Sequence, residues 1–598
     1  MSTQNSYSRR RFLSHSSLGL LAFAGIPNLL RAMEGMHGMP KMTPHKASAN
    51  FKPDVEFELY CKSNSLSILP GQPTLVQQYS AKLLKGPEKT LTEIPGSYLG
   101  PVIRLQKGQK VRIHLHNKLA EPTITHWHGL HVPANMDGHP VYTIDPGERY
   151  VYEFEVLNRA SMNIYHPHPH ETTAKQVYHG LAGAMLINDE EEAALELPSG
   201  EFEIPIVIQD RMFDDTNQLI YVRHMHDRMM GFYGDRILVN GRPDFKLNVA
   251  SRAYRLRVLN GSTARIYKLG WDDGTPITVI GVDGGLLETP ETLPYVMLAP
   301  GERLDVWADF SGRSEGSQLK LRSLPFSGVL PAMAEHGMRG GMGGMMHANS
   351  LPVGSDYPIF SIHVTQKQND SPKLPSKLSK INRYKVSDTA NPKKPIPIAI
   401  SEGPMAMLLN GHPYAYDDIQ SDERIKVNTI QLMEIFHAHG GHGMSSANAD
   451  DKTEENGMRH GMMGGMGRRH GRMGMMGGMD DQDDSRQNST EQEGNMGGMG
   501  MMGMGGGMGM MMAMAHPIHL HGQSFQIVSR STEGKASEDY ASVRDGFIES
   551  GLKDTVLVMP GERVRIIKPF QDFKGLFMYH CHNLEHEDMG MMRDFLVD

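Results

Sequence analysis

Cysteine is scarce in this chain: its 598 residues include only two, Cys61 and Cys581. Secreted proteins stabilised by disulfides usually carry larger, regularly spaced sets. Cys581 belongs to the motif His580-Cys581-His582, which leaves Cys61 without an evident partner. The sequence therefore excludes a framework based on disulfides.

A surplus of positive charge is also absent, because the formal net charge is −8 at pH 7. Proteins that bind nucleic acid usually present a strongly basic surface. This balance argues against nucleic acid as a partner and is compatible with a cationic substrate.

Long hydrophobic runs are missing near the N-terminus. Residues 18–30 form an apolar run too short to span a bilayer, so we expect no stable membrane anchor. The run follows SRRRFL at residues 8–13, and the two together resemble a twin-arginine export signal. We expect residues 1–49 to be this signal and a flexible segment, read by the twin-arginine export machinery, with the periplasm as destination. The alternative is a basic tail before an amphipathic stretch.

Long helical periodicity is nearly absent, whereas short β-branched and aromatic runs alternate with turn signals. The sequence PGER recurs at residues 146–149, 300–303 and 560–563, each time before such a run. A repeated turn at wide spacing predicts three copies of one β-sandwich, which suits the chain length. We therefore predict an all-β fold with domains at residues 50–195, 196–370 and 396–598, and a linker rich in Lys, Pro and Ser at 371–395.

Two segments, residues 333–347 and 437–515, are rich in Met, Gly and His and poor in residues that fill a core. The simplest interpretation is a flexible insertion without a fixed role. Exposed methionine is readily oxidised, however, and its thioether is a soft ligand for Cu(I). We therefore favour a role in collecting copper.

The motif His580-Cys581-His582 carries most of the functional information. Residues two apart on a strand point to one face, so the two histidines share a face and Cys581 points to the other. In the stretch HPIHLH at residues 516–521, His519 and His521 share a face and His516 has the opposite parity. Each segment thus offers side chains to two different sites.

The first of these sites combines His516 and Cys581 with His586 and Met591 from the loop that follows. Two imidazoles, a thiolate and a distant thioether form the ligand set of a blue-copper electron-transfer site. A structural zinc site has no use for the methionine and is usually built from several cysteines.

The second site needs more ligands than His519, His521, His580 and His582. The first third of the chain supplies His126 and His128 in THWHG, and His166 and His168 in YHPH. The pair of His168 and His170 has equal spacing, so the register there is open from spacing alone.

Together the four segments resemble the multicopper oxidases, in which HWHG, YHxH, HPxHxH and HCHxxxHxxxGM occur in this order. The resemblance extends over essentially the whole chain after residue 49 and favours the pair of His166 and His168. It implies three cupredoxin-like Greek-key β-sandwich domains and four copper ions. One is a type 1 copper in the third domain, and the others form a trinuclear cluster between the first and third domains.

The same resemblance implies a role for each ligand. The type 1 copper would take His516, Cys581, His586 and Met591; the type 2 copper His126 and His519; and the two type 3 coppers His128, His166, His168, His521, His580 and His582. Electrons would pass from type 1 copper through Cys581 to its flanking histidines, and four would reduce O2 to two waters. Asp137 and Glu587 stand where members of this family place carboxylates for proton delivery.

The reductant is suggested by methionine near the type 1 motif. Met514 and Met512 share the parity of His516, and Met333, Met338 and Met342 belong to the earlier Met-rich segment. Similar copper-efflux oxidases hold Cu(I) with such methionines, although their Met-rich segment lies earlier in the third domain. The resemblance thus implies a monomeric cuprous oxidase acting on Cu(I) and O2 in copper tolerance.

Two alternatives stay open. One is a laccase-like or bilirubin-oxidase-like enzyme whose reductant is a small phenol or pyrrole. The other is a copper-sequestering binding protein.

Overall fold

The computed structural model describes residues 41–331, 350–403, 406–438, 513–532 and 537–598. Contacts between Cα atoms group residues 1–439 and 508–598 into one unit and residues 440–507 into another. All described residues belong to the first unit. Most of the expected export signal, most of the long Met-rich segment, and Met333, Met338, Met342 and Met512 lie outside the described residues.

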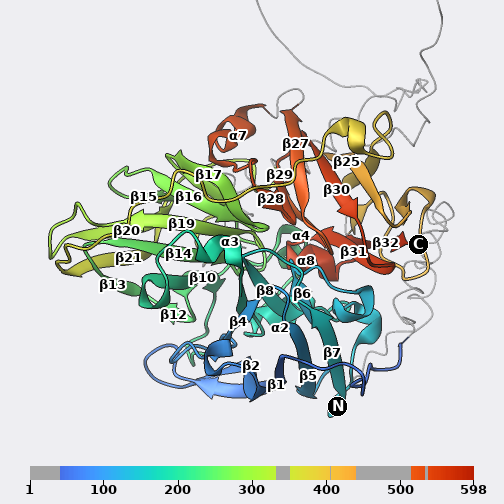
Figure 1. Ribbon diagram of the computed structural model, residues 1–598, viewed down its shortest axis with the longest axis horizontal. Coiled ribbons are helices and arrows are strands. Elements are labelled where there is room, and N and C mark those ends of the chain that lie inside the picture. The colour runs from blue at the N-terminus through green and yellow to red at the C-terminus, as the bar shows by residue number, and fades with distance from the viewer. Residues whose placement is uncertain (1–40, 332–349, 404–405, 439–512, 533–536) are drawn as a thin grey trace, which may run out of the picture. The chain divides into compact units, whose positions relative to one another are not determined.

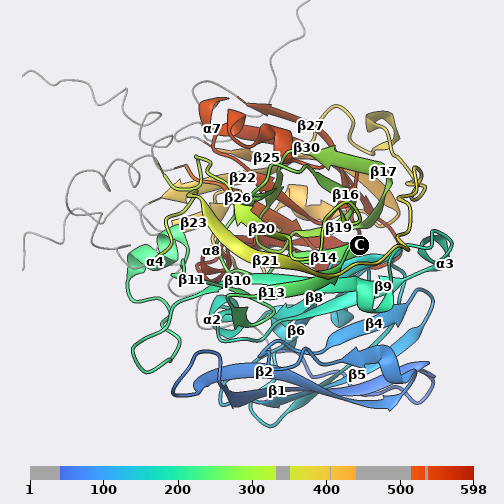
Figure 2. The same cartoon turned by 90° about the vertical axis from the view of Figure 1, so that its left-hand side faces the viewer.

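The first third of the chain forms two facing sheets, coloured blue to teal in Figures 1 and 2. One has the order β2 (Thr74–Lys85), β1 (Val55–Leu66), β5 (Lys110–Lys118), β7 (Arg149–Glu155). The other has the order β3 (Leu91–Thr92), β4 (Val102–Gln106), β9 (Gly183–Asn188), β8 (Ser161–Pro167), β6 (Thr125–His128). Alternate residues of β1, Val55, Phe57, Leu59 and Cys61, are buried between the sheets, as period-two patterning requires.

The second pair of sheets lies between residues 203 and 366. Its larger sheet has the order β12 (Arg242–Pro243), β11 (Arg236–Val239), β10 (Glu203–Arg211), β14 (Ala253–Asn260), β19 (Arg303–Asp309), β16 (Ile277–Val282), β17 (Gly285–Leu293). The smaller has the order β13 (Lys246–Ala250), β21 (Tyr357–Gln366), β20 (Gln318–Ser323), β15 (Tyr267–Trp271), β18 (Val296–Leu298).

The third pair lies between residues 396 and 597. One sheet has the order β23 (Ala406–Leu409), β22 (Ile396–Gly403), β25 (Thr429–His437), β30 (Glu562–Phe570), β27 (Phe525–Thr532), β28 (Leu552–Lys553). The other has the order β24 (Arg424–Ile425), β32 (Met592–Val597), β31 (Gly575–Cys581), β26 (His516–Leu520), β29 (Thr555–Val558). The six sheets form three cupredoxin-like domains, and the predicted fold class is confirmed.

Helices in the described residues are short connections. They are α2 (Thr173–Tyr178), α3 (Glu190–Ala193), α4 (Met225–Met230), α7 (Ser537–Ala541) and α8 (Leu584–Asp588), with 3-10 turns η1 (Glu88–Thr90), η2 (Ala134–Met136), η3 (Pro140–Tyr142), η4 (Gly200–Phe202), η6 (Val386–Asp388), η7 (Ser421–Glu423) and η9 (Arg544–Gly546). In that part of the chain, no helix has the length and apolar character needed to cross a membrane.

The three PGER turns share one geometry. The carboxylates of Glu148, Glu302 and Glu562 each accept a hydrogen bond from the backbone N–H three residues earlier, at 2.8, 2.7 and 2.8 Å. The glycine before each glutamate has a positive φ, of 85°, 82° and 68°, a conformation that glycine adopts without strain. Strands β7 and β19 start at the arginine of the repeat and β30 at its glutamate, so the repeated turn begins one strand in each domain.

Candidate metal centres

Strands β26 and β31 position most of the predicted ligands. They are antiparallel neighbours, with His519 opposite His580 and Ile518 opposite Cys581. Because side chains alternate along a strand, His519 and His580 point to one face of this sheet and Cys581 points to the other. The two strands therefore contribute to two separate clusters of side chains.

The first cluster consists of His516, Cys581 and His586, all completely buried. The sulfur of Cys581 lies 3.4 Å from His516 Nδ1 and 3.7 Å from His586 Nδ1. Met591 is also fully buried, belongs to the same apolar core as Cys581, and accepts a hydrogen bond at its backbone oxygen from the Cys581 N–H, at 3.0 Å. The structure thus brings together all four residues expected at the type 1 site.

The outer nitrogen of each imidazole in this cluster is held by the protein. His586 Nε2 lies 3.0 Å from the backbone oxygen of Met229, and His516 Nε2 lies 3.1 Å from Glu402 Oε1. A carbonyl can only accept, so Nε2 of His586 carries the proton and Nδ1 presents its lone pair toward Cys581. Such outer contacts fix the tautomer that a metal ligand needs.

The protonation states of the side chains in this cluster also favour binding of a metal ion. Burial lowers the pKa of His516 and lowers the pKa of His586 to about 3, so both rings are neutral at pH 7. Burial raises the pKa of the Cys581 thiol well above its usual value. Its sulfur therefore becomes a thiolate only when a cation binds beside it.

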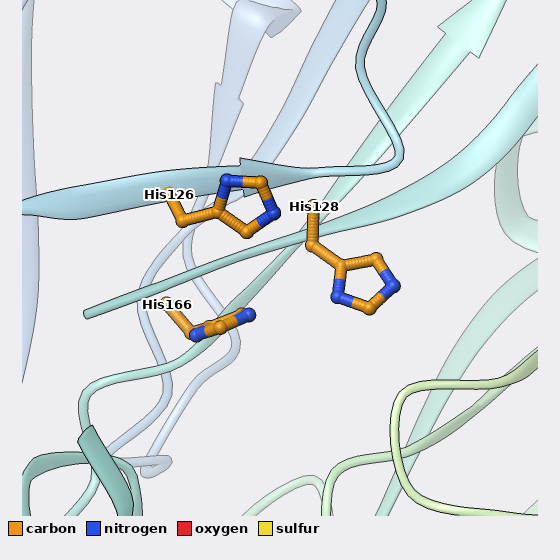
Figure 3. Close-up of side chains that lie close together, drawn as sticks. All are labelled: His126, His128 and His166. Atoms are coloured by element: carbon orange, nitrogen blue, oxygen red, sulfur yellow. The ribbon is translucent and has the colours of Figure 1, made fainter. Parts of the chain in front are cut away.

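The second cluster contains eight imidazoles, each at most 4% exposed. They come from β6, β8, β26, β31 and the residues just after these strands: His126, His128, His166, His168, His519, His521, His580 and His582. Figure 3 shows His126, His128 and His166 close together, on β6 and β8. The rings of His126 and His521 stack at 3.8 Å between centroids, and those of His128 and His519 stack at 3.6 Å.

Three of these rings show which nitrogen is free to bind a metal. Nδ1 of His126, His166 and His519 lies 2.5, 2.9 and 2.9 Å from the backbone oxygens of Asp137, Pro167 and Asp554. These carbonyls accept, so each Nδ1 carries the proton and each Nε2 is an acceptor. Within the described residues all three Nε2 atoms are buried without a hydrogen-bond partner. A buried lone pair without a donor is costly, and a metal ion would satisfy it.

His168, His521 and His580 form a tighter group inside this cluster. Nε2 of His580 lies 3.3 Å from Nε2 of His168 and 3.2 Å from Nε2 of His521. On the outer side, Asp137 Oδ2 lies 2.7 Å from His521 Nδ1, and Glu587 Oε2 lies 3.0 Å from His580 Nδ1. The two predicted acids are buried, and both contact the outer nitrogens of predicted ligands.

The remaining members are His128 and His582. His128 Nε2 lies 3.0 Å from Asp554 Oδ1, and its buried Nδ1 has no hydrogen-bond partner among the described residues. Both ring nitrogens of His582 are buried without a hydrogen-bond partner in the described part of the chain, and its ring lies 4.9 Å from that of His128. His170, which has the same spacing from His168 as His166 does, packs against Tyr414 instead, with 5.3 Å between the ring centroids.

Burial favours the neutral form of six of these imidazoles. It lowers the pKa of His519 to about 4, and it lowers well below their usual range the pKa values of His128, His166, His168, His521 and His582. Neutral imidazole is the form that binds copper, so the donor set fits three copper ions without a proton having to leave these rings.

Acidification is expected to destabilise the copper-free protein. The pKa values of His519, about 4, and His586, about 3, lie below the 6.5 of a free imidazole. Between these values the unfolded chain binds protons that the folded chain does not, so the free energy of unfolding falls as pH drops below 6.5. Thermal melts should show a falling Tm below that pH. His586→Gln should reduce the slope, because it removes one of these shifted imidazoles. A Tm independent of pH would contradict the buried neutral state.

Several contacting residues carry no signal in the sequence. Glu402 and Asp554 each contact imidazoles of a cluster and belong to no recognisable motif; Arg303 belongs to the repeated PGER turn, but that motif does not indicate that it binds Asp554. Glu402 lies 114 positions along the chain from His516, and Asp554 lies 426 from His128. Arg303 lies 251 positions from Asp554. Only the folded chain brings them together.

Of the methionines expected to bind substrate, Met514 is described, and it is buried in the apolar core that contains Cys581 and Met591.

Comparison with known proteins agrees with this geometry. Two family models, both described as multicopper oxidase, match residues 75–192 and 506–598. The chain is 28% identical to the multicopper oxidase mco of Staphylococcus aureus over 87% of each chain. It is 26% identical to a laccase of Bacillus subtilis, over 83% of this chain and 88% of the laccase.

A solved structure leads to the same family. The McoA multicopper oxidase of Aquifex aeolicus is 27% identical, with a TM-score of 0.66, over 94% of this chain and 99% of its own. The family models match both segments that carry the clustered histidines, and these similarities extend over most of the chain. This chain is therefore similar to multicopper oxidases over most of its length.

Proposed function

We propose that this protein is a periplasmic cuprous oxidase, exported by the twin-arginine route, that oxidises Cu(I) to Cu(II) at the expense of O2 and thereby supports copper tolerance. When bound, its four copper ions supply one-electron acceptance from the substrate and four-electron reduction of O2 to water. The export signal is proposed from residues 8–30 of the sequence alone.

The geometry supports a specific ligand assignment. His516, Cys581, His586 and Met591 would hold the type 1 copper, and His126 and His519 the type 2 copper. The compact group of His168, His521 and His580 would hold one type 3 copper, and His128, His166 and His582, whose rings lie 4.9 to 5.7 Å apart, the other. Asp137 and Glu587 would deliver protons from their positions against His521 and His580.

One observation carries the choice of Cu(I) as substrate: Glu402 lies against the outer edge of His516. Glu402 Oε1 is 3.1 Å from His516 Nε2 and 3.2 Å from His437 Nδ1, and it accepts a hydrogen bond from the Met514 N–H at 3.2 Å. A carboxylate, an imidazole and the backbone N–H of a methionine thus meet next to a predicted type 1 ligand. Thioether and imidazole suit copper, and the carboxylate favours a cation.

Further methionines lie on helix α4. Met229 and Met230, at the end of α4, belong with Met514 to the apolar core around Cys581, and Met225 at the start of α4 is 51% exposed. Burial alone would raise the pKa of Glu402, but contacts with His437 and His516 hold this pKa well below its usual value. Glu402 is thus negatively charged at neutral pH, which favours a cation over a neutral phenol at this position.

The decisive experiment compares O2 uptake driven by Cu(I) with uptake driven by a bulky phenol. In the copper-loaded protein, Met514→Leu should lower kcat/KM for Cu(I) by about 10- to 100-fold, the usual cost of losing a contact at a metal site. The rate with the phenol should change little, because the leucine keeps the side-chain volume. Met185→Leu, which replaces a buried methionine in the core of the first domain, should leave both rates unchanged.

Other outcomes identify the alternatives. The relative named laccase favours oxidation of phenols as the second candidate, and fast phenol turnover with negligible Cu(I) turnover would establish it. Stoichiometric Cu(I) binding without O2 consumption would instead indicate a sequestering protein. Deletion of residues 440–510 tests whether the Met-rich segment contributes to either rate.

A further inference from the structure

Arg303, from the PGER turn of the second domain, joins all three domains at one point. Its guanidinium donates all five of its N–H groups. Nε binds the Met162 oxygen in β8 of the first domain, at 2.9 Å. The terminal nitrogens bind the backbone oxygens of Gly301 and Asp283 in the second domain, at 3.0 and 3.2 Å, and both carboxylate oxygens of Asp554 in the third, at 2.7 and 2.5 Å.

The corresponding arginines of the other two turns are placed differently. Arg149 is exposed, and Arg563 pairs with Glu434 while its side chain stays 32% exposed. The side chain of Arg303 is 1% exposed. Since the turn itself is closed by the glutamate in all three copies, the burial of Arg303 is not needed to make the turn. It has a separate role.

That role is indicated by what Asp554 contacts. Its Oδ1 lies 3.0 Å from His128 Nε2, and its backbone oxygen lies 2.9 Å from His519 Nδ1. The hydroxyl of Thr555 lies 3.3 and 3.1 Å from the same two nitrogens and donates to Asp554 Oδ1 at 3.0 Å. Asp554 therefore sets the orientation of two stacked rings, one from the first domain and one from the third.

Glycines leave room for this junction. A Cβ on Gly129, the glycine of HWHG, would lie 2.7 Å from an Arg303 nitrogen and 2.8 Å from Asp554 Oδ2. A Cβ on Gly301 would lie 2.9 Å from the ring of His582. Both glycines also have positive φ, 90° and 82°. The second domain therefore packs directly against side chains of the histidine cluster.

We propose that Arg303 is a positioning residue for the trinuclear centre: by fixing Asp554 it sets the ring orientations of His128 and His519. A domain that supplies none of the proposed copper ligands would thus control the geometry of copper held by the other two. This inference rests on the proposed assignment of His128 and His519 to copper.

The bidentate geometry explains why arginine is required. A guanidinium matches both oxygens of a carboxylate and has donors left for three carbonyls, whereas lysine offers a point charge with three donors. Without the guanidinium, Asp554 would be a buried carboxylate lacking its counter-charge, which is strongly unfavourable. Asp554 would then move or take up a proton, which would disturb the contacts of its carboxylate with His128 Nε2, at 3.0 Å, and with His519 Nδ1, at 3.5 Å.

The test compares Arg303→Met and Arg303→Lys with Arg255→Met, all in the full-length, copper-loaded protein. Arg255 is a matched control, because it is also a buried arginine of the second domain paired with carboxylates, Asp305 and Glu192, away from the cluster. Three quantities are measured: copper per chain, the blue type 1 absorption, and the electron paramagnetic resonance spectrum of type 2 copper. Thermal unfolding of each copper-free variant reports the purely structural cost.

We expect Arg303→Met to weaken copper retention at the trinuclear centre by about 10- to 100-fold, as loss of an outer contact to a metal ligand typically does. Its type 2 signal should change while the blue absorption stays. Arg303→Lys should change the type 2 signal less, and it carries the test if the methionine variant does not fold. Arg255→Met should lower Tm without altering either signal.

Two results would overturn parts of this account separately. A normal type 2 spectrum and copper content in Arg303→Lys and in any folded Arg303→Met, with only Tm reduced, would show that Arg303 is merely structural. If the wild-type protein itself gives no type 2 signal when loaded with copper, the ligand assignment is at fault and Arg303 loses its proposed role with it.

Discussion

Replacing Cys581 with serine is expected to abolish the blue absorption and all oxidase turnover. Cys581 supplies the only sulfur that lies between His516 and His586 at 3.4 and 3.7 Å from their Nδ1 atoms, among the residues that the structure describes. A serine hydroxyl is a hard and weakly acidic donor, and it cannot replace a thiolate in a blue-copper ligand set. The loss should be complete rather than graded. Absorption spectra and O2 uptake of the copper-loaded variant measure both effects.

The chain offers its own control for this experiment. Cys61 is a second free and fully buried cysteine, in the core of the first domain and outside both clusters. Cys61→Ser should cost some stability, because it buries a hydroxyl, but should keep the colour and the activity. Persistence of the blue band in Cys581→Ser, or its loss in Cys61→Ser, would refute the assignment of the type 1 site.

Replacing Asp137 with asparagine is expected to slow O2 reduction by about 10- to 100-fold without slowing reduction of the type 1 copper by Cu(I). The Asp137 carboxylate lies 2.7 Å from Nδ1 of His521, and its backbone oxygen, 2.5 Å from Nδ1 of His126, remains in the variant. Asparagine keeps the shape but loses the negative charge and cannot deliver a proton. The first effect is measured by O2 uptake, and the second by anaerobic reduction followed at the blue band.

A second buried pair provides the comparison. His139 Nε2 lies 2.9 Å from Asp594 Oδ1, an equally buried contact between histidine and aspartate, and neither residue is a predicted copper ligand. Asp594→Asn should therefore reduce stability and leave O2 reduction close to that of the wild type. If Asp137→Asn slowed reduction of the type 1 copper as much as that of O2, it would have no specific role in proton delivery.

Parity along single strands predicted much of the candidate site. The alternation in His580-Cys581-His582 separated Cys581 from its neighbours, and the structure places Cys581 with His516 and His580 with His521. Such predictions succeed because the direction of a side chain on a strand depends on local backbone geometry alone. The repeated PGER turn predicted three similar domains, because the geometry of a turn also depends on its own few residues.

The contacts around the two clusters could not be predicted from the sequence. Glu402 meets His516 because β22 and β26 lie in the two sheets of one domain, and Arg303 meets Asp554 because two domains pack together. Nothing local to Glu402 distinguishes it from other charged residues of β-sandwiches, and the PGER motif does not distinguish Arg303 from Arg149 and Arg563 of the other two turns. Packing between sheets decides their partners, and one sequence does not reveal that packing. Met333, Met338, Met342 and Met512 remain predictions, since they lie outside the described residues.

The histidine cluster has a consequence for biosynthesis. Its imidazoles come from β6 and β8, near the beginning of the chain, and from β26 and β31, near the end. A nascent chain still lacking its last strands has only four of the eight imidazoles, and binding of metal by those four would be weak. Tight binding of metal would thus distinguish a fully synthesised and folded molecule from an incomplete one.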